Sequence, residues 1–110
     1  MKYILAVALL MSTPATAETW ATAKCTTQSG TMIDYILHDG KGFISYNKNK
    51  PEPMFSRREN NFGIIVHIGA TGNMTMAVDL TSGRGYVIAK FDDGTSSEQN
   101  VACQLGTIER

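Results

Sequence analysis

The sequence predicts an all-β fold, a small antiparallel barrel or sandwich of about eight short strands closed by one disulfide. Three observations support this class. Apolar residues recur at every second position within short stretches, and turn residues such as Asp-Gly separate these stretches. No stretch shows a sustained helical period between capping residues. The chain also holds two cysteines, one near each end of the predicted domain.

The first residues have the features of a secretory signal peptide. Lys2 is followed by the apolar stretch Tyr3–Met11, and Ala15 and Ala17 occupy the small-residue positions of a cleavage site. Cleavage is therefore expected between Ala17 and Glu18. A membrane anchor is the rival interpretation, but the apolar stretch is about half of the ~20 residues that span a bilayer.

Residues 1–17 are thus expected to be removed, and residues 18–110 to form a single exported domain. Removing 17 of the 110 residues leaves 93, enough for one modest core. The loss of Lys2 leaves nine basic against ten acidic residues, a net charge of about −1. This balance argues against nucleic acid or anionic lipid as a partner. We expect a periplasmic or secreted domain with no membrane span.

The two cysteines, Cys25 and Cys103, are expected to form a disulfide. Export places them in an oxidising compartment, and two cysteines allow only one intramolecular pairing. They lie 78 positions apart, and closing a loop of this length should stabilise the fold by about 4 kcal/mol in the chain-entropy model. A metal site or a redox pair would need closer spacing and more ligands.

The strands are expected in the stretches that alternate between turn signals. In chain order they are Thr19–Thr26, Thr31–His38, Gly42–Tyr46, Met54–Arg58, Phe62–Ile68, Asn73–Leu80, Gly85–Phe91 and Asn100–Leu105. The cysteines fall in the first and last of these, so the disulfide would join neighbouring strands of a closed or nearly closed sheet.

One clear hairpin defines the first half of the domain. In the second strand Ile33, Tyr35 and Leu37 share one face, and the turn signal "DGKG" follows at Asp39–Gly42.

The stretch 47–53, "NKNKPEP", contains two prolines, which cannot donate to a β-ladder. It is therefore expected to be the longest loop.

In the second half, the stretch Gly69–Gly72, "GATG", resembles a dinucleotide-binding turn. Such a turn needs a third glycine and a helix, whereas Thr75 stands at the third position and the following residues alternate. We expect a hairpin loop whose glycines provide freedom in φ, followed by a strand whose even-numbered residues from Met74 to Leu80 point inward. The stretch 92–100, "DDGTSSEQN", is expected to be a polar loop.

No candidate for catalysis or metal binding emerges. His38 and His67 are the only histidines, neither has ligand partners at metal spacing, and His67 is expected on one face of a half-exposed sheet. Asp92 and Asp93 are expected to be solvated turn residues. We therefore expect no metal, no cofactor and no enzymatic activity, since catalysis would need converging titratable groups in a cleft.

The aromatic side chains are expected to form plain core, because side chains usually fill the interior of so small a barrel. A closed apolar pocket is the alternative. The residues concerned are Trp20, Tyr35, Phe43, Tyr46, Phe62, Tyr86 and Phe91.

Five short motifs spread over nearly the whole exported domain resemble those of small exported alphaproteobacterial proteins of unknown function. They are "ETW" at Glu18–Trp20, Cys25, "NNFGIIV" at Asn60–Val66, "VDLTSG" at Val78–Gly83, and Cys103. The resemblance implies an exported, disulfide-closed and β-rich protein, and nothing about its activity.

A second resemblance lies in Ser82–Tyr86, "SGRGY". This stretch is similar to the Ser-Gly-x-x-Tyr loop of the periplasmic inhibitors of C-type lysozyme, which are small β-barrels with one disulfide. The resemblance implies that Ser82, and with it Arg84, would contact the catalytic carboxylates of lysozyme.

The function expected from the sequence is non-enzymatic binding, or a structural role in the cell envelope, with a protein or envelope component as partner. Loops are where a partner would touch, and Lys48, Lys50, Ser82 and Arg84 are the possible contacts. One alternative is inhibition of C-type lysozyme. Another is carriage of a small apolar ligand, which an apolar cavity of at least a few hundred Å³ would mark. No pattern indicates an oligomeric state.

Overall fold

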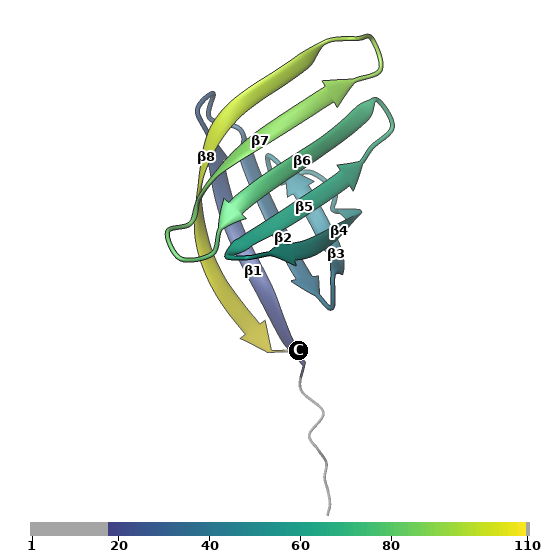
Figure 1. Ribbon diagram of the computed structural model, residues 1–110. Coiled ribbons are helices and arrows are strands. Elements are labelled where there is room, and N and C mark those ends of the chain that lie inside the picture. Colours follow the sequence, from purple (N-terminus) through teal and green to yellow (C-terminus); the bar gives the residue numbers. More distant parts are fainter. Residues whose placement is uncertain (1–17, 110) are drawn as a thin grey trace, which may run out of the picture.

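The computed structural model describes residues 18–109, which form a closed barrel of eight antiparallel strands (Figure 1). Each strand pairs with the next, and the last pairs with the first. The strands are β1 (Thr19–Thr27), β2 (Met32–His38), β3 (Lys41–Tyr46), β4 (Glu52–Glu59), β5 (Phe62–Ile68), β6 (Gly72–Asp79), β7 (Arg84–Phe91) and β8 (Ser96–Glu109). The all-β prediction is confirmed, and the sheet closes as a barrel. The predicted signal peptide, including Ala17, lies outside the described residues.

The two ends of the barrel differ in their connections. The upper end in Figure 1 carries the loops 28–31, 47–51, 69–71 and 92–95, and the lower end carries the turns 39–40, 60–61 and 80–83. Asp39 and Gly40 both have positive φ, as the Asp-Gly signal predicts for a tight hairpin.

Side chains alternate between the inside and the outside of the barrel, as the sequence pattern predicts. The most deeply buried ones lie in the middle and lower interior and include Ile44, Met54, Ile65, Met76 and Val78. They come from β3, β4, β5 and β6, so this core ties neighbouring strands together from within.

The disulfide joins Cys25 of β1 to Cys103 of β8, as predicted. The two residues face each other directly in the register of the closing strand pair. The bond thus fixes the seam where the barrel closes, and it indicates an oxidising, extracytoplasmic environment.

The predicted loop 47–53 is too long, because β4 already begins at Glu52. Pro53 lies opposite Phe43 of β3, whereas the pairing of β4 with β5 begins only at Phe55. Pro53 therefore lies where β4 has a neighbour on one side only, and a residue without an N–H is tolerated there.

The predicted polar loop 92–100 is also wrong in its second half. Residues from Ser96 onward belong to β8, and Ser97 and Gln99 pair with Ala89 and Val87 of β7. Leu80, expected inside the sheet, instead follows β6 and is exposed.

The "GATG" stretch forms the predicted hairpin, but freedom in φ is not what its glycines provide. Neither Gly69 nor Gly72 has a positive φ. A Cβ at Gly72 would lie 2.3 Å from the carbonyl oxygen of Lys90, and one at Gly69 would lie 3.3 Å from the His67 ring. Close approach of neighbouring groups therefore explains both glycines.

Candidate functional site: the cavity at the upper end of the barrel

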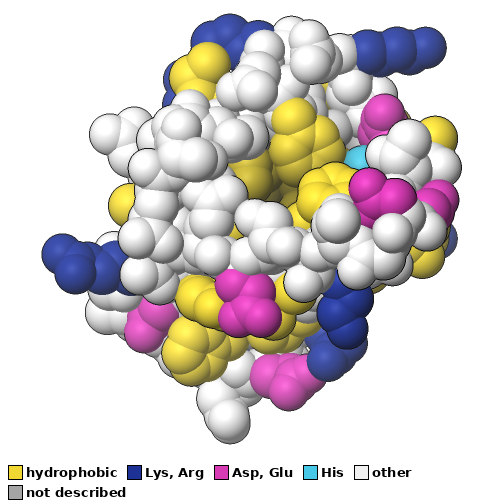
Figure 2. Space-filling model, turned by 90° about the horizontal axis from the view of Figure 1, so that it is seen from above, with side chains coloured by type: hydrophobic (Ala, Val, Ile, Leu, Met, Phe, Trp, Pro, Cys, Tyr) yellow, Lys and Arg dark blue, Asp and Glu magenta, His cyan; other side chains and the backbone are white. Residues whose placement is uncertain are grey.

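The upper end of the barrel holds a cavity of about 430 Å³, which we call the upper cavity. Figure 2 looks into this end and shows a hollow with hydrophobic side chains at its bottom. Its apolar lining includes Ile33, Met74, Val87, Ala89 and Phe91, and its polar lining includes Thr27, Tyr46, Glu52, His67, Ser97 and Gln99. The expectation that side chains fill the whole interior is therefore wrong.

Small residues explain why the upper interior stays open. Ala89 of β7 lies between Met74 of β6 and Ser97 of β8, and all three side chains line the cavity. One level higher, Gly72 lies opposite Phe91. Deeper in the barrel the corresponding pair is Met76 and Val87, which fills the space. The change from large to small inward residues thus marks the floor of the cavity.

Three titratable side chains from three neighbouring strands form a hydrogen-bonded chain in the cavity wall. The Tyr46 hydroxyl lies 2.8 Å from Nδ1 of His67, and Nε2 of His67 lies 2.9 Å from Oε1 of Glu52. The side chain of His67 is only 8% exposed, whereas that of Glu52 is 55% exposed. The chain therefore runs from the interior towards the mouth of the cavity.

The partners of His67 decide the direction of these hydrogen bonds. A carboxylate only accepts, so Nε2 of His67 carries a proton and donates it to Glu52. In the neutral ring Nδ1 is then an acceptor, and the Tyr46 hydroxyl donates to it. His67 was expected on a half-exposed face, but it points into the barrel with both nitrogens paired.

The phenol of Tyr46 is held in its protonated form. Burial, and then the negative charge of Glu52, raise the pKa of Tyr46 from 10.0 to about 12. Both causes disfavour the phenolate, so the hydroxyl keeps the proton that it donates to His67.

The aromatic residues separate into three groups. Tyr35 belongs to the core, and Tyr46 and Phe91 line the upper cavity. The others lie outside the core: Trp20 is half-buried, and Phe43, Phe62 and Tyr86 are exposed. The expectation that they form plain core thus holds for Tyr35 and not for the group as a whole.

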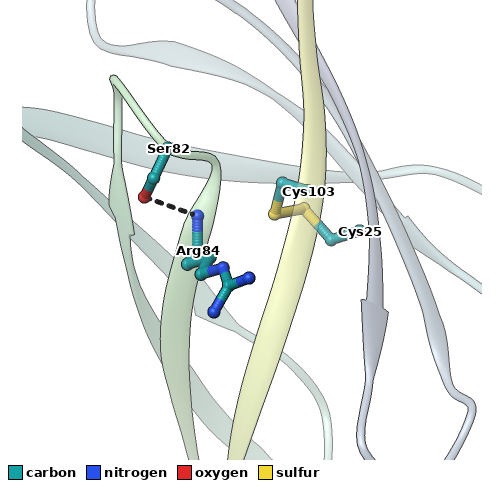
Figure 3. Close-up of a disulfide and its surroundings, with 4 residues drawn as sticks. All are labelled: Cys25, Ser82, Arg84 and Cys103. Atoms are coloured by element: carbon teal, nitrogen blue, oxygen red, sulfur yellow. Dashed lines mark hydrogen bonds between the residues drawn. A yellow bond between two sulfur atoms is a disulfide. The ribbon is translucent and has the colours of Figure 1, made fainter.

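The possible contact residues predicted from the sequence lie at opposite ends of the barrel. Lys48 and Lys50 are exposed in the upper loop 47–51 and do not line the cavity. Ser82 and Arg84 lie at the lower end, beside the strand that carries Cys103 (Figure 3). The structure therefore does not bring the two pairs together.

The turn that carries Ser82 is fixed by several hydrogen bonds. One oxygen of Asp79 accepts from the backbone N–H groups of Thr81 and Ser82 and from the side chain of Asn61. The N–H of Cys103 donates to the carbonyl of Gly83 at 2.7 Å. The exposed Ser82 hydroxyl accepts from the N–H of Arg84, so this turn presents a defined shape to solvent.

The described residues contain neither a metal-binding group nor a helix that could span a membrane. Between residues 18 and 109, no group of three or more His, Cys, Asp or Glu side chains is placed to hold a metal ion. The same part of the chain contains no helix long and apolar enough to cross a membrane.

Sequence reasoning missed Glu52, Ser97 and Gln99 as site residues because it placed all three in loops. One signal could have identified the last two. Ser97 and Gln99 share the odd-numbered face of Val101 and Cys103, so extending the alternation of β8 backwards places them inside the barrel.

Comparison with known proteins finds no match: no family model, no curated protein and no solved structure matches this chain.

Proposed function

We propose that this protein is a non-enzymatic, periplasmic or secreted binding protein that holds a small ligand in the upper cavity. The observation that carries the proposal is the open cavity of about 430 Å³ inside a closed barrel. Ligand pockets span roughly 300–1,000 Å³ and combine apolar walls with a few oriented polar groups. An eight-stranded barrel is just wide enough to hold one small ligand.

The polar groups in the cavity favour binding over catalysis. Glu52, His67 and Tyr46 converge there, as titratable groups in an enzyme would. However, the raised pKa of Tyr46 keeps the phenol protonated and makes it a poor nucleophile or base. The three hydrogen-bonded side chains are suited to orienting a bound molecule by hydrogen bonds.

Titration with N-phenyl-1-naphthylamine, a neutral apolar dye that fluoresces in apolar surroundings, tests the proposal. We expect saturable binding with one site per protein. The variant Ala89→Phe places a large side chain in the cavity and should weaken dye binding at least tenfold, because Ala89 lines its wall.

The matched control is Ala102→Phe, which adds the same side chain at an exposed position on β8. It should bind the dye as the unmodified protein does. Absence of saturable binding, or equal weakening by both substitutions, would contradict the proposal.

A second candidate function, inhibition of C-type lysozyme, is favoured by the fixed turn around Ser82. Asp79 accepts a hydrogen bond from the N–H of Ser82, and the N–H of Cys103 donates to the carbonyl of Gly83, so this exposed turn is held in place. A preorganised loop loses little entropy on entering a cleft. The similarity of "SGRGY" to the inhibitor loop supports the same assignment.

Addition of the purified protein at micromolar concentration should then slow a C-type lysozyme. Ser82→Ala should weaken the inhibition, whereas Ser96→Ala at the upper end of the barrel should not. Unchanged lysozyme activity would remove this candidate and leave the upper cavity unaffected.

A further inference from the structure

In the hydrogen-bonded chain of the upper cavity, both hydrogen-bond donors are already paired with other members of the chain. The Tyr46 hydroxyl donates to His67, and Nε2 of His67 donates to Glu52. What the three groups can still offer to a ligand is therefore acceptors: a lone pair on the phenol oxygen and the lone pairs of the Glu52 carboxylate. A ligand that binds to these three side chains must therefore supply hydrogen-bond donors.

The charge of the cavity lining also favours a ligand that supplies hydrogen-bond donors. Glu52 is the only Asp, Glu, Lys or Arg among the described residues that line the cavity. Lys48 and Lys50, in the neighbouring loop, are not part of the lining. With the His67 ring neutral, the fixed charge that a bound ligand meets is thus negative.

The position of Glu52 determines how such a ligand would lie. Its side chain is 55% exposed near the mouth, whereas Met74 and Val87 lie deep in the barrel and are 5% and 6% exposed. A molecule with a polar head and an apolar body would therefore place its body against these two residues and its head at the mouth.

We propose that the upper cavity selects small apolar amines, with the protonated amino group bound by Glu52 at the mouth and the apolar body in the interior. This inference rests on the proposed function and names its ligand class. A charged donor on a carboxylate makes a stronger hydrogen bond than a neutral donor does, and solvent at the mouth reduces the advantage.

The test compares three probes with one apolar body and different heads: hexylamine, hexan-1-ol and hexanoate. Binding is measured by calorimetry with the oxidised protein at about pH 8, where an alkylamine is protonated and an imidazole is ordinarily neutral. We expect hexylamine to bind about tenfold more tightly than hexan-1-ol, a difference of about 1.4 kcal/mol, and hexanoate to bind most weakly.

Glu52→Gln is the decisive variant, because the amide oxygen can still accept from His67 while the charge is lost. It should abolish the preference for the amine over the alcohol. Glu59→Gln is the matched control, since Glu59 is an exposed carboxylate at the other end of the same strand. It should leave the preference unchanged.

The outcomes separate the two proposals. If hexan-1-ol binds as tightly as hexylamine, or if Glu52→Gln retains the preference, the amine inference is wrong and the cavity remains a binding site. If none of the probes binds and the neutral dye does not bind either, the proposed function itself is wrong. Should Glu52→Gln fail to fold, the comparison of probes on the unmodified protein decides.

Discussion

His67 shows how a polar residue is accommodated inside this small barrel. A buried imidazole without partners would destabilise the fold, but both ring nitrogens are hydrogen-bonded, to Tyr46 and to Glu52. The inward position of His67 follows from its two-residue spacing from Ile65 in β5. Its partners come from β3 and β4, and no local pattern in the sequence joins them to it.

The raised pKa of Tyr46 makes the stability of the protein depend on pH above 10. Below pH 10 the phenol is protonated in both the folded and the unfolded chain, so its contribution is fully present. Between pH 10 and about 12 the unfolded phenol ionises while the folded one does not, so the free energy of unfolding should fall. Urea unfolding at several pH values in this range measures the fall.

Tyr46→Phe is the reference for this measurement, because burial also raises the pKa of Tyr35. The variant should lose less stability between pH 10 and 12 than the unmodified protein does. An identical pH dependence in the two proteins would show that the environment of Tyr46 does not favour its protonated form.

The strands differ in how well the sequence predicts them. The stretch Phe62–Ile68 is predicted with its observed bounds, because it is apolar and has turn residues on both sides. The start of β4 and the first residues of β8 instead carry loop signals in the sequence. In β4 a proline lies where only one neighbouring strand pairs, and in β8 polar residues face an open cavity. Both exceptions depend on neighbours that only the closed barrel provides.

The closing strand pair β1 and β8 is the one that the disulfide cross-links. Reduction of Cys25–Cys103 frees a loop of 78 residues in the unfolded chain and should lower the free energy of unfolding by about 4 kcal/mol. Urea unfolding of the oxidised and the reduced protein measures this difference. Titration of free thiols in each sample confirms its redox state.

The size of this change measures how far the disulfide restricts the unfolded chain. A much smaller change would mean that this restriction is weaker than the chain-entropy model predicts. Reduction without any effect on unfolding would contradict the assigned role of the bond.

At the scale of the whole molecule, the barrel has a filled part and an open part. The alternation of the strands predicts which residues point inward, but not whether they meet across the interior. That depends on which inward residues lie at the same height, which is set by the register between neighbouring strands. Ala89 and Ser97 face each other only in that register, so the alternation alone does not distinguish a filled interior from the pocket that the sequence leaves as an alternative.

Substitution of two methionines on the same face of β6 tests whether the barrel has a filled part and an open part. Met76 lies in the filled part and is 0% exposed, whereas Met74, two residues away, lines the upper cavity. Met76→Ala leaves an enclosed void and should lower the free energy of unfolding by about 2–5 kcal/mol. Met74→Ala enlarges a space that is already open to solvent, so it should destabilise less. Urea unfolding of the two variants gives the comparison directly. Equal losses would mean that the interior is packed evenly along its length, and the proposed binding site would then lose its physical basis.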